Sequence, residues 1–226
     1  MLTVAPERDL VERQLGNGEL VGPRCEAGVL GGHGWVGRRW LRRADGLVVL
    51  LKAHATAEEL AGGKVASGLR RSRCKRAECQ ATHVLLPAGM LGRRLDEVEV
   101  IGAALVARAS GAGCRRIGAA AGRPMSTVRG WLMRLEQNAR PLRAAFTGLV
   151  HRLEVSPPVL TAGRGEAAEA VAAMGEAAAA ARRLLGTSMR ALSPWQVVAA
   201  VSHGRLLAVA APARLFYTSR HLVLTM

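Results

Sequence analysis

The chain has 226 residues, a formal net charge of +15 at pH 7 and few aromatic side chains, namely four Trp, two Phe and one Tyr. This length allows one large domain or two small ones, and the scarcity of aromatic rings argues against a β-sandwich and for packed helices. The charge argues against an ordinary neutral enzyme and favours a polyanionic partner, most simply nucleic acid, although a GC-rich genome would also supply many arginines.

Residues 1–20 are predicted to be an N-terminal extension with one short helix, Glu7–Leu15, that ends at the glycines of 16–18. Charged residues follow Pro6 at once, so the apolar run of a signal peptide does not develop. The longest apolar segment, 197–209, contains a His and an Arg and cannot span a bilayer. We therefore expect a soluble, cytoplasmic protein, associated with the nucleoid if it binds DNA.

Residues 21–88 are predicted to form a small irregular unit with some β-structure. Glycine-rich turns surround short apolar runs, and the run Leu47–Leu51, which follows an Asp-Gly pair, predicts a strand. The four cysteines, at positions 25, 74, 79 and 114, are irregularly spaced. In a chain that we expect to stay in the cytoplasm, this pattern indicates thiols or metal ligands rather than a disulfide framework.

Residues 95–137 carry the clearest helical periodicity. Apolar residues recur at three- and four-residue intervals until the Ser-Gly-Ala-Gly stretch at 110–113. Beyond it, Val128 follows Ile117 by eleven residues, with Gly122 between them where a turn requires a positive φ. This spacing is typical of a helix-turn-helix, in which two helices meet at a steep angle.

The second helix of this motif is predicted to have two different faces. The side expected to be buried carries Val128, Trp131, Leu132 and Leu135.

Two further positions bear on the motif. A glycine is expected at position 118 because a larger side chain there would collide with the second helix, whereas Arg123 stands where the motif usually has an aliphatic residue. The residues predicted to contact DNA are Arg115, Arg116, Arg123, Met125, Ser126, Thr127, Arg129 and Arg134. The alternative is an amphipathic helical hairpin whose arginines are merely solvated.

Residues 138–165 are predicted to be a basic linker, and residues 166–226 a C-terminal helical segment. The alanine-rich stretch Glu166–Leu185 has acids in its first turn and arginines in its last, which the helix dipole favours. Ser193 and Pro194 predict the start of a second, short helix. One face of the longer helix either forms a homodimer seam or packs on the short helix of the same chain. This face comprises Val171, Met174, Ala178, Ala181 and Leu185.

Three segments resemble an uncharacterised family of bacterial helix-turn-helix proteins related to transposases. They are RCKRAECQATHVLLP at 73–87, EVIGAALVARASGAGCRRIGAAAGRPMSTVRGWL at 99–132 and SPWQVVAAVSHGRLL at 193–207. The resemblance implies a zinc-ribbon-like N-terminal part, a central helix-turn-helix and a helical C-terminal part. It thus implies DNA binding more firmly than it implies any reaction.

That family usually has a Cys-Pro-x-Cys pair and, before a Thr-His segment, a Cys-x-x-Cys pair. Here Gly22 takes the first position of the first pair, and four residues rather than two separate the second pair. A structural zinc site requires four tetrahedral ligands. The ligands would be Cys25, Cys74, Cys79 and either His33 or His83. Alternatively, the site has been lost and the cysteines are ordinary thiols.

The predicted fold class is mainly α, with a three-helix helix-turn-helix core, a small irregular β-containing N-terminal unit and a C-terminal helical segment. The predicted function is sequence-specific binding of double-stranded DNA, as a transcriptional regulator or a transposase-related DNA-binding protein. The alternative is a transposase or recombinase of a mobile element, or its inactive remnant. A transposase needs three gathered carboxylates, whereas the aspartates at 9, 45 and 96 are dispersed, and a recombinase nucleophile would have to be Tyr217. We therefore expect no enzymatic activity.

Overall fold

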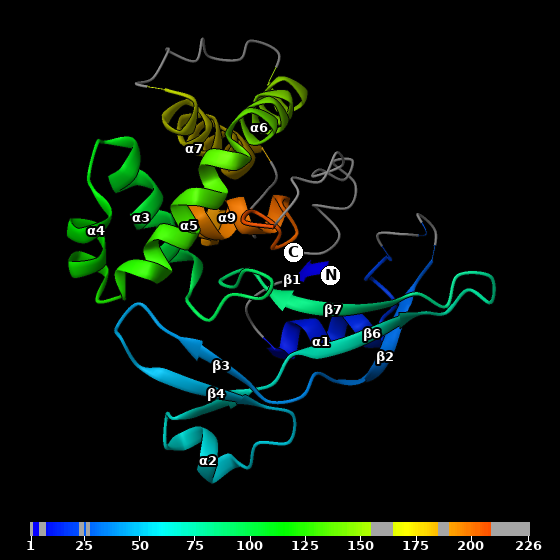
Figure 1. The fold of residues 1–226 in the computed structure, drawn as a ribbon. Coiled ribbons are helices and arrows are strands. Elements are labelled where there is room, and N and C mark those ends of the chain that lie inside the picture. The colour runs from blue at the N-terminus through cyan, green and yellow to red at the C-terminus, as the bar shows by residue number, and fades with distance from the viewer. Residues whose placement is uncertain are drawn as a thin grey trace.

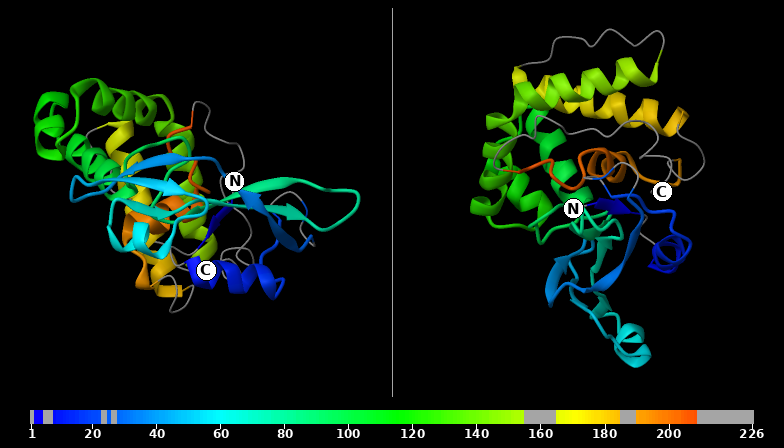
Figure 2. Two further views of the ribbon diagram at one scale, coloured as in Figure 1. Left: turned by 90° about the horizontal axis from the view of Figure 1, so that it is seen from below. Right: turned by 90° about the vertical axis from the view of Figure 1, so that its right-hand side faces the viewer.

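The structure is a computed structural model that describes residues 2–4, 8–22, 25, 28–154, 165–184 and 190–208. Two mixed β-sheets lie on one side of the molecule and most of the helices gather on the other (Figures 1 and 2). Within these ranges, no helix has both the length and the apolar character needed to cross a membrane.

The larger sheet has four strands in the order β1-β7-β6-β2. Its strands are β1 (Leu2–Val4), β7 (Thr82–Pro87), β6 (Arg70–Cys74) and β2 (Leu30–Trp35). β1 runs parallel to β7, and the other two pairings are antiparallel. Leu2, Leu30 and Leu85 of this sheet form a core with Val11 and Leu15 of helix α1 (Arg8–Gly16).

The smaller sheet has three strands, β3 (Arg39–Arg42), β4 (Val48–Lys52) and β5 (Val65–Ser67). β3 and β4 form an antiparallel hairpin, while β5 returns parallel to β4 after the short helix α2 (Ala57–Ala61). Thr56 and Glu59 cap α2 reciprocally through a capping box. One face of the hairpin is buried through Leu51, which packs with Leu69, Leu86 and Met90.

Six helices form the largest core. They are α3 (Val98–Ala109), α4 (Cys114–Ala121), α5 (Met125–Gln137), α6 (Ala139–Leu153), α7 (Glu166–Leu184) and α9 (Pro194–Val201). Phe146, Leu135 and Met174 are fully buried at its centre, and α7 contacts α3, α6 and α9. At Gly102 any side-chain carbon would overlap the indole of Trp195, so this glycine lets α9 dock closely on α3.

The prediction of a mainly α fold with only a small irregular β-unit is wrong. Helices account for 49% of the structure and strands for 20%, and the strands form two mixed sheets. The strands LGGHGW, RWLR and RRSRC lack the alternation of apolar and polar residues that reveals a half-buried strand. Two of the pairings, β1 with β7 and β2 with β6, also join distant parts of the chain, which a local pattern does not report.

Most individual elements were located correctly. The predicted strand at 47–51 corresponds to β4, and the predicted helices near 7–15, 98–109 and 166–185 correspond to α1, α3 and α7. The predicted short helix at Pro194 is α9, with a capping box between Ser193 and Gln196.

The segment 138–165, expected to be a linker, differs from that expectation because it contains the fifteen-residue helix α6. The face of α7 that offered a dimer seam is buried inside the chain through Val171, Met174, Ala178 and Ala181. This matches the intramolecular alternative, while Leu185 lies outside the described residues.

Candidate nucleic-acid interface and metal site

Two glycines allow the tight connection between α4 and α5, Gly122 in the turn and Gly118 in the last turn of α4. Gly122 adopts the left-handed conformation, with φ 59° and ψ 38°, and its amide donates to carbonyls in the last turn of α4. A side-chain carbon on Gly118 would stand 3.0 Å from the carbonyl oxygen of Arg123. α3 packs on both helices, so the two helices and the turn between them lie where the spacing predicts them.

The two faces of α5 differ as the sequence predicts. Val128, Trp131, Leu132 and Leu135 are all at most 3% exposed. On the other side, Met125, Ser126 and Arg129 are exposed to solvent, and Thr127 is half-buried. Since the buried face fixes the rotation of α5 about its axis, the exposed side chains are held outward on a rigid support.

The arginines expected around this face occupy three different environments. Arg115 and Arg116, in the first turn of α4, are exposed. Arg134 is half-buried and donates to the carbonyl of Gly130, 3.0 Å away. Arg123 is buried, so its guanidinium does not belong to the exposed surface.

The buried guanidinium of Arg123 fixes the turn to the rest of the molecule. Its Nε donates to the carboxylate of Asp96 at 2.5 Å, and its Nη2 donates to the carbonyl of Arg43 at 3.1 Å. Its Nη1 donates to the carbonyls of Ala121 and Gly122. Arg123 was expected to contact DNA, but these partners give it a structural role. Its burial is possible because the carboxylate of Asp96 compensates its charge.

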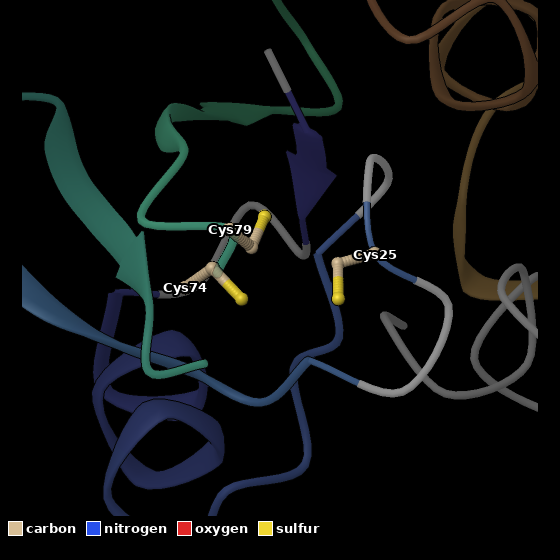
Figure 3. Close-up of side chains that lie close together, drawn as sticks. All are labelled: Cys25, Cys74 and Cys79. Carbon is tan, nitrogen blue, oxygen red and sulfur yellow. The ribbon is translucent and has the colours of Figure 1, made fainter. Parts of the chain in front are cut away.

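Three of the four cysteines come together at one end of the larger sheet. The sulfur atoms of Cys25, Cys74 and Cys79 all lie within 4.8 Å of one another (Figure 3). Cys25 lies in the loop before β2, while Cys74 ends β6 and Cys79 lies in the turn that leads to β7. Tetrahedral Zn–S bonds of about 2.3 Å would bring the sulfurs to about 3.8 Å, so a small contraction suffices. The arrangement can therefore hold a metal ion.

The cluster packs against Gly28 and borders a cavity. A side-chain carbon on Gly28 would stand 2.9 Å from the sulfur of Cys25 and still closer to that of Cys74, so glycine is required there. Burial raises the pKa of the Cys74 thiol. The neighbouring Cys25 raises the pKa of Arg76, which lines a cavity of about 440 Å³ beside the cluster with Glu78.

The two histidines considered as a fourth ligand lie in different environments. Neither belongs to the group of three sulfurs. His33 is exposed on β2, whereas His83 is buried on β7. The register of β6 and β7 pairs His83 with Ser72, two residues from Cys74, so His83 is on the same face of the sheet as Cys74. A side-chain carbon on Gly22, the position where the resembling family has cysteine, would stand 3.7 Å from Nε2 of His83.

The aspartates considered for catalysis stay apart. Asp96 is buried against Arg123, Asp45 lies at the exposed tip of the β3–β4 hairpin, and Asp9 lies on α1. Among the described residues, three or more potential metal ligands lie close together only in the cysteine cluster. Tyr217, the alternative nucleophile, lies outside the described residues.

Comparison with known proteins adds no information about the function of this chain. No protein-family model matches the chain, and neither a curated protein nor a solved structure does so. The resemblance to transposase-related helix-turn-helix proteins therefore stays an expectation from the sequence.

Proposed function

We propose that this protein binds double-stranded DNA sequence-specifically by placing α5 in the major groove. The observation that carries this proposal is the exposed face of α5, with Arg129 at its centre and Met125 and Ser126 at its start. A B-DNA major groove admits one α-helix, and an arginine there can donate two hydrogen bonds to guanine. The Gly122 turn and the buried side of α5 hold this face rigidly.

The charge around α5 supports the same proposal. The chain carries a net charge of +15, and Arg115 and Arg116 are exposed on the adjoining helix α4. Arginines beside a recognition helix bind phosphates and fix the register of the protein, without reading the sequence. Ser126 and Thr127 add hydroxyl groups at the start of α5 that can also donate to phosphate.

The role proposed is that of a regulator or other DNA-binding protein that acts without catalysis and resides on the nucleoid. The engagement of Asp96 with Arg123 and the separation of the other two aspartates favour this role over that of a transposase. Because one helix-turn-helix covers a short half-site, we also propose that two chains pair on DNA. The pairing surface would lie away from α7, whose apolar face is covered within the chain.

We further propose that Cys25, Cys74 and Cys79 bind a structural zinc ion, with His83 as the fourth ligand. The close sulfurs and the glycine at position 28 support the first part. The burial of His83 and its place beside Gly22 favour it over the exposed His33. Such a zinc ion would join the loop before β2 to the β6–β7 turn and stabilise the larger sheet.

Selection of bound sequences from random duplexes, followed by footprinting, tests the proposed function. We expect enrichment of a short motif and protection of one major-groove face, or of two faces about one helical turn apart if the protein pairs. Recovery of unenriched sequences at every salt concentration would contradict specific recognition.

A further inference from the structure

The β3–β4 hairpin carries a tryptophan between arginines on a face turned to solvent. Trp40 is 53% exposed, and Arg42, which is half-buried, lies two residues after it on the same face of β3. Arg38, two residues before Trp40 and just outside the strand, is exposed. The strand register pairs Trp40 with Leu50 and Arg42 with Val48. These five residues form a surface that we name the outer hairpin face.

The opposite face of the hairpin is occupied by the protein core. Val49 and Leu51 are both 4% exposed, and Leu51 packs beneath β7. Arg39, which alternates with Trp40, donates inward to the carbonyls of Leu91 and Arg94. The inner face of the hairpin thus supplies its packing and hydrogen bonds to the core. The exposed tryptophan on the outer face has no such role in the fold.

The hairpin is attached directly to the helix-turn-helix. The carbonyl of Arg43, at its tip, accepts the 3.1 Å hydrogen bond from Arg123, two residues before α5 begins. Ala44 lines a cavity of about 290 Å³ together with Ala120 and Ala121 of α4. Figure 1 shows the tip of the hairpin beside the start of α5. A duplex bound to α5 would therefore pass close to the hairpin.

The outer hairpin face also has the charge that a duplex requires. At the tip, Arg43 is near two carboxylates, 3.6 Å from Asp45 and 4.0 Å from Glu97. In contrast, no ion pair within the described part of the chain engages Arg38 or Arg42. The flanks of Trp40 thus carry two uncompensated positive charges.

We infer that the outer hairpin face binds the backbone and minor groove of the DNA that flanks the half-site read by α5. This inference rests on the proposed function. The negative potential of a narrow minor groove attracts arginine, and an exposed apolar ring can pack on the sugars or press between base steps. A β-ribbon beside a recognition helix therefore extends the contacted length of duplex.

The inference is tested by titrating two duplexes with the full-length protein. The short duplex ends at the footprint of α5, and the long duplex extends beyond it on the hairpin side. Trp40→Ala and Arg42→Ala should each weaken binding to the long duplex about tenfold and leave the short duplex unchanged. Arg13→Ala removes the same charge from an exposed arginine of α1 and is the matched control, expected to bind both duplexes like the wild type.

The outcomes separate this inference from the proposed function. If the wild type binds neither duplex, the proposed function fails. If the wild type binds and Arg129→Ala weakens both duplexes, while the Trp40 and Arg42 variants match Arg13→Ala, only the hairpin contact is overturned. Loss of self-association in light scattering by Trp40→Ala, without an effect on DNA, would assign the face to a second copy and likewise overturn it.

Discussion

The guanidinium of Arg123 and the carboxylate of Asp96 form an ion pair at 2.5 Å, with only 5% and 6% of the two side chains exposed. Asp96 lies two residues before the start of α3, and Arg123 lies in the turn before α5. The same guanidinium binds the carbonyl of Arg43 in the β3–β4 hairpin. One buried cation thus joins the first helix of the helix-turn-helix, its turn and the smaller sheet.

Removal of one partner of this pair should destabilise the whole fold. Arg123→Ala leaves the carboxylate of Asp96 buried without its cation, and we expect a loss of about 3–5 kcal/mol in the free energy of unfolding, measured with urea. The matched control is Arg108→Ala, which breaks an exposed 2.8 Å pair with Glu136 and should cost about 0–1 kcal/mol.

Replacement of both partners should restore much of this stability. Arg123→Met combined with Asp96→Leu removes both buried charges, so the double variant should be more stable than Arg123→Ala. Equal, small losses for Arg123→Ala and Arg108→Ala would show that the pair is not a structural link.

The turn glycines should respond differently from a glycine in an open helix. Gly122→Ala forces a side chain into the left-handed conformation and should cost about 1–2 kcal/mol of stability. Gly118→Val should cost more, because its side chain meets the Arg123 carbonyl. Gly175→Ala, on the exposed side of α7 with open space around it, should instead stabilise by about 0.5–1 kcal/mol. Thermal denaturation of the three variants checks the order, and a stabilising Gly122→Ala would contradict the turn geometry.

The cysteine cluster should bind zinc with a stoichiometry near one per chain. Elemental analysis of the purified protein should show this metal, and Cys74→Ser or His83→Ala should lower its content, whereas Cys114→Ser and His33→Ala should not. A chelator should loosen residues 22–87 first, as measured by hydrogen exchange. A zinc content at background level in the wild type would contradict the proposed site. Retention of zinc by His83→Ala would show that another residue is the fourth ligand.

Zinc affinity should also rise with pH. Burial raises the pKa of the Cys74 thiol, so this group keeps its proton at neutral pH in the metal-free protein. Zinc binds the thiolate and must displace that proton, which becomes easier as pH rises toward the pKa. The stability of the metal-free protein, in contrast, should fall as pH rises. A raised pKa contributes stability below the pKa of the unfolded thiol, and this contribution is lost as pH rises through the folded value.

The sequence predicted α4, the turn and α5 better than the sheets, for a physical reason. The positions of Ile117, Gly122 and Val128 report local geometry, and the turn and both buried faces lie where that spacing puts them. The strands β2 and β6 contain glycine and arginine, and the residues that pair between them are more than thirty positions apart, so no local pattern reveals this pairing.

The same distinction applies to the candidate site. The three cysteines were selected by residue type, and the fold brings them together. The inward direction of Arg123 depends on Asp96, 27 residues earlier, which the sequence offered only as a scattered carboxylate. Trp40 was missed because the exposure of a tryptophan depends on which face of its strand is covered.

The most direct test of the account compares Arg129→Ala with the wild type on the selected duplex and on a scrambled duplex, at several salt concentrations. Wild-type affinity should fall steeply as salt rises, because arginine–phosphate contacts release counterions. Arg129→Ala should cost about 1–3 kcal/mol on the selected duplex and little on the scrambled one, while Arg115→Ala and Arg116→Ala should weaken both about equally. Absence of wild-type binding even at low salt would contradict DNA recognition. Equal losses from Arg129→Ala on both duplexes would contradict the assignment of α5 as the helix that reads the sequence.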